Sequence, residues 1–304
     1  MSWKPVTIIQ TAEGKNQCPV VDTNNEGFWR IYYSHRDENK YSHTSYIDVE
    51  AGKPEKLIQK SQTPVLSPGK AGEVDTSGAM ATSILTMNDS LKYMYYIGWT
   101  QRKDVPYYNT TCLAVSEDGN TWNKVGPILS PCIHDSGYSG TFYPILNKSK
   151  TEYTALYLSC FEWIDGDPRY NLKRAISKDG VNWTKTLDVA IDITPEEGGV
   201  SQASILYNSM QGVYQLWYSV RDKYDFRTNP KHSYRIRYAE SLDLINWTKV
   251  QDSIYDINPG LQNFIDFDEV MCAYPCVVKH EDTLFMFYNG NGFGNTGIGV
   301  LRWE

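Results

Sequence analysis

The sequence lacks the features that mark membrane spans, exported chains and nucleic-acid-binding proteins. Nowhere do 18 apolar residues follow one another, and the opening MSWKPVTIIQTAEGKN contains no basic segment before an apolar core. We therefore expect a soluble, cytoplasmic protein. There is no long basic run, and the formal net charge is −7. This balance argues against nucleic acid or a membrane as partner and favours a small, neutral or weakly charged ligand.

Metal-binding patterns are also missing. The six cysteines are scattered, and only Cys272 and Cys276 lie close together, at a spacing that matches no common zinc site. The histidines are isolated, so no metal triad is predicted. We expect no metal and no cofactor, with the cysteines reduced and mostly buried.

Aromatic residues, in contrast, are abundant. They make up 13% of the chain, with 23 Tyr and 9 Trp, while charged residues make up 21%, which is typical of a β-rich globular protein. Three similar stretches stand out, namely SEDGNTW ending at Trp122, SKDGVNW ending at Trp183 and SLDLINW ending at Trp247. Asp-Gly between two β-rich runs is a hairpin signal, so each stretch is predicted to join two strands. The three Trp side chains are expected to pack between neighbouring units of a repeat.

Two other elements recur five times. One is a β-rich run with a shared Tyr at positions 33, 96, 157, 218 and 288, and the other is the preceding run, as in CPVVD, MATSIL and TFYPIL. Four short strands per unit and few helices predict an all-β, five-bladed β-propeller with four-stranded antiparallel blades. The expected blades of this single domain are 17–60, 79–127, 140–189, 200–252 and 271–304 plus 3–10. Residues 3–10 would supply the missing outer strand and close the ring.

Loops on one face of such a propeller are the natural place for a site. The loops that enter the first strands carry acidic residues, which are candidate acid and base groups for a glycosidic bond: Asp75, Asp135, Glu197 and Glu269. Solvated turn caps are the alternative interpretation of these carboxylates. Candidate substrate-binding residues are Arg36, Trp99, Tyr143, Glu162, Trp163, Arg221 and Asn289.

The two arginines in that set occupy the same position of the repeat. They could clamp an anionic group or form salt bridges between blades. Trp99, Tyr143 and Trp163 would stack on sugar faces. The pattern as a whole is that of a pocket for a sugar, a glycan or a nucleotide-sugar; the sequence does not indicate the oligomeric state.

The YYS and WYS strands, the hairpins SKDGVNW and SEDGNTW, YRIRYAES and the ending MFYNGNGFGNTGIGV carry a resemblance over the whole chain. The chain resembles the five-bladed propeller glycosidases, which include arabinanases, β-xylosidases, invertases, levansucrases and mannoside phosphorylases. It looks most like uncharacterised members found with surface-polysaccharide genes. The resemblance implies a glycoside hydrolase-like enzyme acting by carboxylate acid/base chemistry on a glycosidic or sugar-phosphate bond.

The chain departs from the arabinanase and xylosidase pattern where that pattern places its carboxylates. The Asp-Pro pair of the family base is Cys18-Pro19 here, and the matching acids of the second and third blades are absent from AMATSIL and SGTFYPIL. The alternative is therefore a non-catalytic glycan or nucleotide-sugar binding protein, or a biosynthetic enzyme, in surface-polysaccharide assembly. Buried and inert is the favoured interpretation of Cys18.

Overall fold

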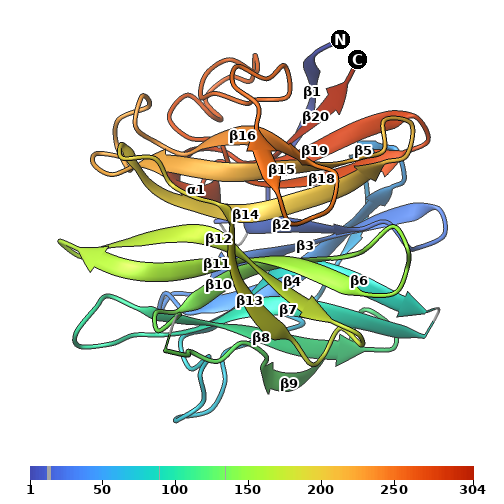
Figure 1. Ribbon diagram of the computed structural model, residues 1–304. Coiled ribbons are helices and arrows are strands. Elements are labelled where there is room, and N and C mark those ends of the chain that lie inside the picture. The colour runs from blue at the N-terminus through green and yellow to red at the C-terminus, as the bar shows by residue number, and fades with distance from the viewer. Residues whose placement is uncertain (12–14, 89, 134) are drawn as a thin grey trace.

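A computed structural model describes residues 1–11, 15–88, 90–133 and 135–304, and its ordered elements are almost all β-strands. Their alternation of large apolar and small or polar residues is the pattern of strands with one or both faces buried. Consecutive strands pair antiparallel in groups of four, and the groups are stacked around a common centre (Figure 1). The all-β prediction is confirmed.

The groups follow one another along the chain. The first holds β2 (Gln17–Asp22), β3 (Phe28–Arg36), β4 (Ser42–Glu50) and β5 (Lys53–Lys60). The second holds β6 (Gly78–Asn88), β7 (Leu91–Thr100), β8 (Tyr108–Ser116) and β9 (Asn123–Pro127). The third holds β10 (Ser139–Leu146), β11 (Tyr153–Ile164), β12 (Asp167–Ser177) and β13 (Thr184–Ile191). The fourth holds β14 (Glu197–Asn208), β15 (Val213–Asp222), β16 (Arg235–Ser241) and β17 (Trp247–Lys249). The last holds β18 (Ala273–His280), β19 (Thr283–Asn289), β20 (Ile298–Trp303) and β1 (Trp3–Ile9), with the one-turn α1 (Asn291–Gly294) before β20.

The first strands of the groups form the centre of the molecule. Contacts join β2 to β6, β6 to β10, β10 to β14, β14 to β18 and β18 back to β2. At the ends of the chain, β1 pairs antiparallel with β20, from Trp3 opposite Trp303 to Ile9 opposite Ile298. The N-terminal strand therefore covers the edge that β20 would otherwise leave open.

In all three repeated turns that end in Trp, the hydroxyl of the first Ser accepts the backbone N–H three residues later. In the second group the Ser116 hydroxyl accepts the Gly119 N–H at 2.8 Å, and Gly119 has a φ of +71°, which glycine adopts without strain. The Trp122 indole donates to the Gly119 carbonyl at 3.1 Å and contacts Tyr32 of the preceding group edge-to-face. The tryptophan thus packs between neighbouring groups and not in a ligand site.

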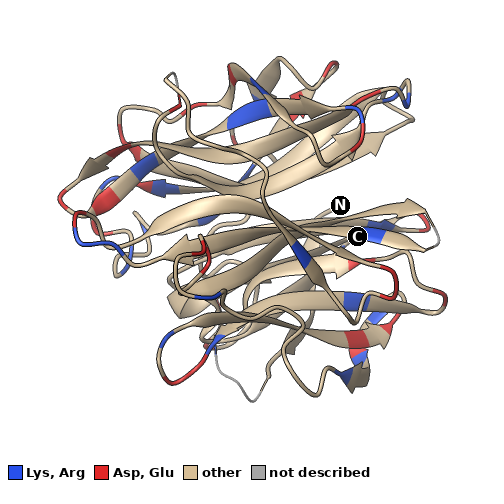
Figure 2. Ribbon diagram, turned by 90° about the horizontal axis from the view of Figure 1, so that it is seen from below, with Lys and Arg blue, Asp and Glu red and all other residues tan. Residues whose placement is uncertain are grey.

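Charged residues lie mainly at the turns and on the outer strands, with both signs mixed (Figure 2). Of the helices in the described ranges, none has the length and apolar character needed to cross a membrane.

Candidate functional site

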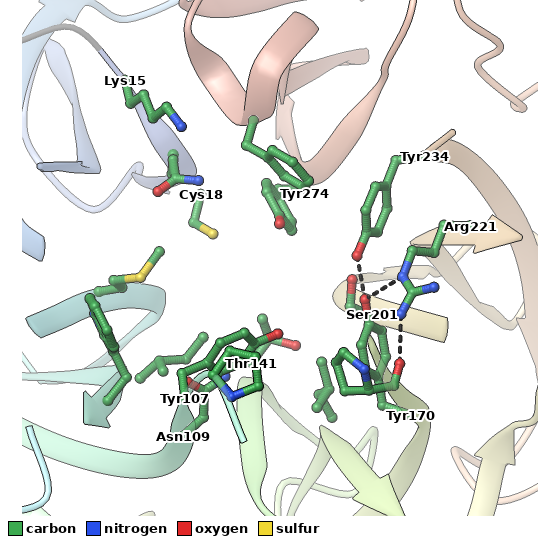
Figure 3. Close-up of a pocket in the computed structure, with 18 of the residues that line it drawn as sticks. Lys15, Cys18, Tyr107, Asn109, Thr141, Tyr170, Ser201, Arg221, Tyr234 and Tyr274 are labelled. Carbon is green, nitrogen blue, oxygen red and sulfur yellow. Dashed lines mark hydrogen bonds between the residues drawn. The ribbon is translucent and has the colours of Figure 1, made fainter. Parts of the chain in front are cut away.

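A cavity of about 500 Å³ lies where the first strands meet, and we call it the central cavity. Each first strand contributes at least one residue to its wall, including Cys18, Met80, Thr141, Ser201 and Tyr274. Figure 3 shows the side chains of these and other strands pointing into a common space, with Lys15 and Cys18 on one side and Tyr170, Tyr234 and Arg221 on the other. A site at this place receives groups from all parts of the chain.

Every first strand has a β-bulge near the cavity, because the pairing register with its neighbour shifts there. At three of these bulges a residue other than glycine has a positive φ, namely Cys18 (53°), Gln202 (48°) and Tyr274 (57°). Such residues are uncommon, and bulges re-aim side chains next to sites. The strained backbone is held by buried partners: the Cys18 N–H donates to Asn289 Oδ1 and the Tyr274 N–H to Ser219 Oγ, both at 2.8 Å.

Beside the cavity, the Gln202 side chain links two strand groups by a hydrogen bond. The Gln202 side chain leaves β14 and donates through Nε2 to the Thr82 carbonyl of β6 at 3.1 Å, although these strands belong to groups that do not follow one another. The Gln202 N–H in turn donates to Thr141 Oγ1 at 3.1 Å. These two hydrogen bonds connect the first strands of the second, third and fourth groups next to Ser201 of the cavity wall.

The wall of the central cavity is positively charged. It contains five cationic side chains and, among the described residues that line it, no Asp or Glu: the cations are Lys15, Arg36, Lys40, Arg221 and Arg227. Of these, only Arg227 has a carboxylate partner within the described ranges, Asp167 at 2.8 Å. Burial and then the positive charge of Arg36 lower the pKa of Lys15. Two like charges that repel each other across a pocket favour an anion between them.

Arg221 is fully buried and is held by neutral groups. Its Nε donates to the Tyr170 hydroxyl at 3.0 Å and its Nη2 to the Pro168 carbonyl at 2.6 Å. Its guanidinium lies 3.9 Å from the Phe226 ring centroid. The Tyr170 hydroxyl also forms a short hydrogen bond with that of Tyr234. A buried cation with no counter-charge in the described residues adds to the positive field of the cavity, since charge is poorly screened in a low-dielectric interior.

The wall also offers aromatic faces and unused polar atoms. Arg36 lies 5.5 Å from the Trp99 ring, and Tyr107 and Tyr274 add two phenol groups. Three buried polar atoms of residues in the wall have no hydrogen-bond partner within the part of the chain that the structure describes: Gln17 Oε1, Trp99 Nε1 and Ser201 Oγ.

The Cys18 thiol and the Tyr107 phenol of the cavity wall do not transfer protons readily near neutral pH. Burial raises the pKa of the Cys18 thiol to about 12, so the thiol stays protonated and unreactive, which agrees with the sequence-based interpretation. Burial likewise raises the pKa of Tyr107 to about 12. Tyrosines here act as hydrogen-bond donors and stacking surfaces.

Of the substrate-binding candidates, Arg36, Trp99 and Arg221 line the central cavity. The other four do not. Tyr143 is packed beside the core and bonds to the Ile205 carbonyl, and Trp163 lies behind Tyr107 with ring centroids 5.3 Å apart. Glu162 is exposed on β11. Asn289 fixes the Cys18 backbone, as described above.

None of the four candidate catalytic carboxylates lines the central cavity. Two of them, Asp75 and Asp135, are buried, and each is bonded to a tyrosine and a lysine of its own strand group. We call this arrangement of carboxylate, tyrosine and lysine a tie. Asp75 accepts hydrogen bonds from the Tyr96 hydroxyl at 3.1 Å and from Lys124 Nζ at 2.6 Å. Tyr96 is the shared Tyr of its second strand, and Lys124 stands two residues after the Trp of the repeated turn. The structure therefore gives the Asp75 carboxylate structural partners.

Asp135 belongs to the same kind of tie, with the Tyr157 hydroxyl at 2.8 Å and Lys185 Nζ at 2.7 Å. Lys173 Nζ, at 3.2 Å, adds a second positive charge. Burial alone would raise the pKa of Asp135, but hydrogen bonds from Lys185, Ser159 and Tyr157 hold it below its ordinary value. Asp135 is thus ionised and fully engaged.

The remaining two carboxylates lie elsewhere. Glu197 is 3.4 Å from Lys249 and lines a second cavity, which is described below. Glu269 is exposed and accepts a hydrogen bond from Asn291 at 2.9 Å. In the last group Asp268, and not Glu269, bonds to the shared tyrosine, Tyr288, at 2.7 Å.

The sequence-based interpretation missed Lys15 and the four tyrosines of the wall, Tyr107, Tyr170, Tyr234 and Tyr274. A signal for two of them was present. Tyr170 and Tyr234 stand at matching positions of the third strands, in RYNLKRAIS and SYRIRYAES. Two tyrosines at one repeat position, each near a strand end, predict a pair facing the same space.

The second cavity, of about 630 Å³, lies beside the fourth group and contains a carboxyl group of unusual pKa. Burial raises the pKa of Asp256 to about 6, against the attraction of Arg237 and with a contribution from the negative charge of Asp252. The native state therefore keeps a proton that the unfolded state loses near pH 4, so this group's contribution to stability falls as pH rises from about 4 to about 6.

We expect Asp256→Asn to remove that pH dependence. Because asparagine does not ionise, the free energy of unfolding of the variant relative to wild type should rise by about 2–3 kcal/mol between pH 4 and pH 7.5. Urea denaturation at the two pH values measures the difference. A difference that stays constant with pH would mean that Asp256 ionises normally.

We compared the chain with protein families, curated proteins and solved structures. No family model matches the chain. A curated, uncharacterised protein of Mycobacterium tuberculosis strain H37Rv is 28% identical over 314 residues and covers all of both chains, and a protein of strain CDC 1551 matches equally well. Their descriptions assign no activity.

Solved structures extend this finding. A structure of a BT0996–RGII complex is 18% identical with a TM-score of 0.75, covering 100% of this chain and 91% of that one. A structure from work on the GH130 family of mannoside phosphorylases, described as containing glycoside hydrolases that target β-1,2 mannosidic linkages in Candida mannan, is 15% identical with a TM-score of 0.72, covering 99% and 91%. A thermostable family-43 glycoside hydrolase is 13% identical with a TM-score of 0.67, covering 98% and 91%. The chain thus has the fold of the glycoside hydrolase-like β-propeller proteins, as its motifs predicted.

Proposed function

We propose that this chain is a carbohydrate-active protein whose central cavity binds an anionic saccharide. The observation that carries the proposal is the composition of the cavity wall. Lys15, Arg36 and Lys40 have no carboxylate partner in the described residues, and aromatic rings surround them. The carbohydrate class is supported by the neighbours, among which are glycoside hydrolases and mannoside phosphorylases.

The two parts of such a ligand match two parts of the cavity. Sugar hydroxyls need hydrogen-bond donors and acceptors beside a flat ring. The wall holds the rings of Trp99 and Tyr107, and Gln17, Ser201 and Trp99 each have a polar atom without a partner in the described residues. The anionic part, a phosphate or a uronate carboxylate, would lie between Lys15 and Arg36, where it relieves their repulsion. The cavity volume of about 500 Å³ is in the range of small-ligand sites.

The cations of the cavity wall also favour a second candidate function, in which the protein transfers a glycosyl group to phosphate. Hydrolysis by carboxylates needs two carboxyl groups around the bond, and the described wall has none. A hydrogen phosphate held by Lys15 and Arg36 would supply the attacking oxygen: its bond to the anomeric carbon forms as the glycosidic C–O bond breaks, and the leaving oxygen takes the proton of the hydrogen phosphate, which gives a sugar phosphate and a free alcohol. Because Asp75, Asp135, Glu197 and Glu269 are engaged elsewhere, none of them has a role in this proposal.

We further infer that the strand groups are the five blades of one propeller domain. The cycle of contacts among β2, β6, β10, β14 and β18 supports a closed ring, and so does the pairing of β1 with β20. A ring of this kind would hold the central cavity rigid, which suits a site assembled from every blade.

A thermal-shift screen of the purified protein tests the function. Neutral sugars, uronates, sugar phosphates and nucleotide-sugars are compared, since a ligand at 100 times its Kd stabilises the native state by about 2.7 kcal/mol. We expect the charged sugars to stabilise the protein more than neutral sugars do at the same concentration. Any neutral disaccharide is then incubated with and without phosphate, and phosphate-dependent release of a sugar phosphate supports the transfer reaction. Tight binding with no turnover would instead indicate a binding protein, and stabilisation by neutral sugars alone would contradict the proposal.

A further inference from the structure

The second cavity, here named the lateral cavity, is lined by residues of the fourth strand group and of the segments that precede and follow it. Its charged and hydroxyl-bearing members include Glu197, Tyr218, Arg237, Lys249 and Asp256. It is separate from the central cavity, because no residue of its wall belongs to the other.

The lateral cavity lies where the fourth group lacks the closed contact among a carboxylate, a tyrosine and a lysine that the second and third groups have. In the second and third groups the tyrosine donates to the carboxylate at 3.1 and 2.8 Å, and the lysine lies 2.6 and 2.7 Å away. In the fourth group Lys249 lies 3.4 Å from Glu197, and the Tyr218 hydroxyl has no hydrogen-bond partner among the described residues. A carboxylate, a tyrosine and a lysine are again present, but Glu197 accepts the Thr194 N–H at 2.8 Å and Lys249 donates to the Asp192 carbonyl at 2.7 Å, so the three side chains line the cavity instead of closing on one another.

A second observation points to a ligand. Asp256 Oδ1 is buried and has no hydrogen-bond partner among the described residues, in a side chain that is only 10% exposed. The nearest cation, Arg237 Nε, is 3.7 Å from the other carboxylate oxygen, and Arg237 Nη2 is already bonded to Asn258 Oδ1 at 2.9 Å. Buried polar groups are nearly always hydrogen-bonded, so the Tyr218 hydroxyl, which lacks a partner in the described residues and belongs to a residue only 3% exposed, indicates that a ligand group in this cavity would stabilise the protein.

We propose that the lateral cavity binds an uncharged, hydroxyl-rich ligand, such as one or two sugar units. Carboxylates of Glu197 and Asp256 would accept from its hydroxyls, while Tyr218, Lys249 and Arg237 would donate to them. The described residues contain no group of three or more His, Cys, Asp or Glu placed to hold a metal ion. The carboxylates also disfavour an anion. Alternating donors and acceptors with balanced charge match a polyol.

The two cavities lie close enough to serve one glycan. Glu197 of the lateral cavity and Ser201 of the central cavity stand four residues apart on β14, which is about 13 Å along a strand. A chain with its charged end in the central cavity would place a later, neutral unit in the lateral one. The lateral site itself does not depend on the proposed function, since it concerns different residues and an uncharged ligand.

Calorimetric titration with three neutral disaccharides, maltose, cellobiose and mannobiose, tests the inference. We expect at least one to bind wild type with a millimolar Kd. Asp256→Asn should weaken that binding about tenfold and Tyr218→Phe about fivefold, because a hydrogen bond to a charged group contributes more than one between neutral groups. The matched control is Tyr96→Phe, which removes the equivalent hydroxyl from a closed tie and should leave the Kd within about twofold.

Two results would overturn the lateral site. One is that none of the three sugars binds, and the other is that binding survives both Asp256→Asn and Tyr218→Phe. Arg36→Gln separates this inference from the proposed function. This variant should bind the neutral sugar as wild type does but bind mannose 1-phosphate more weakly. Loss of neutral-sugar binding in this variant would assign that sugar to the central cavity instead.

Discussion

Replacing Arg36 by glutamine should weaken the binding of mannose 1-phosphate by about 10- to 150-fold. Arg36 lies over Trp99 in the central cavity, and the change removes one charge-assisted hydrogen bond of about 1.5–3 kcal/mol to the anionic group. The loss should be smaller at high salt, because screening reduces what the charge contributes in wild type. Calorimetric titration of both proteins at two ionic strengths measures the effect.

Arg102 provides the matched control. It is an exposed arginine that pairs with Asp104 at 3.0 Å and is not among the residues of the cavity wall. Arg102→Gln removes the same charge from the protein and should change the Kd by less than about twofold, since exposed pairs contribute little. If Arg36→Gln and Arg102→Gln weakened binding equally, the effect would come from net charge and not from a site at Arg36.

Replacing Asp135 by asparagine should reduce the free energy of unfolding by about 3–5 kcal/mol. The carboxylate is buried against Lys185 and Lys173, and its loss leaves two ammonium groups without a counter-charge. Asparagine also keeps only one acceptor oxygen in place of the two that bond to Tyr157 and Ser159. Urea denaturation at pH 7 measures the difference. An aspartate that served only catalysis would give an inactive protein of unchanged stability.

The control for this prediction is Asp188→Asn. Asp188 pairs with Arg174 at 2.6 Å but is exposed, so its removal should cost less than about 1 kcal/mol. Equal losses in the two variants would show that burial does not set the strength of these ties. A stable but inactive Asp135→Asn protein would make Asp135 a catalytic candidate again.

Much of the fold is deducible from the sequence because it repeats. The shared tyrosines at 33, 96, 157, 218 and 288 all lie in second strands. The missing fourth strand of the last group implied a partner from residues 3–10, and β1 (Trp3–Ile9) pairs with β20. The tryptophans of the repeated turns pack between groups, as their recurrence suggested. Local rules are sufficient here, since alternation and turn chemistry determine strands and hairpins.

The site is less deducible because it depends on where side chains point. Sequence position places Asp75 before a first strand, but its carboxylate turns to Tyr96 and Lys124 within the group. The lysines at 124, 185 and 249, always two residues after the tryptophan, were the available sign that these acids have structural partners. The bulges that aim Cys18 and Tyr274 inward follow from packing around the axis, which no local pattern encodes.

The most direct test of the central claim is a comparison of mannose 1-phosphate with mannose, each titrated into the wild-type protein by calorimetry at low and moderate salt. The cationic, carboxylate-free wall of the central cavity predicts that the phosphorylated sugar binds at least about tenfold more tightly and that salt weakens its binding. Equal affinity for the two sugars, or an affinity for mannose 1-phosphate that does not change with salt, would contradict a central cavity built for an anionic saccharide.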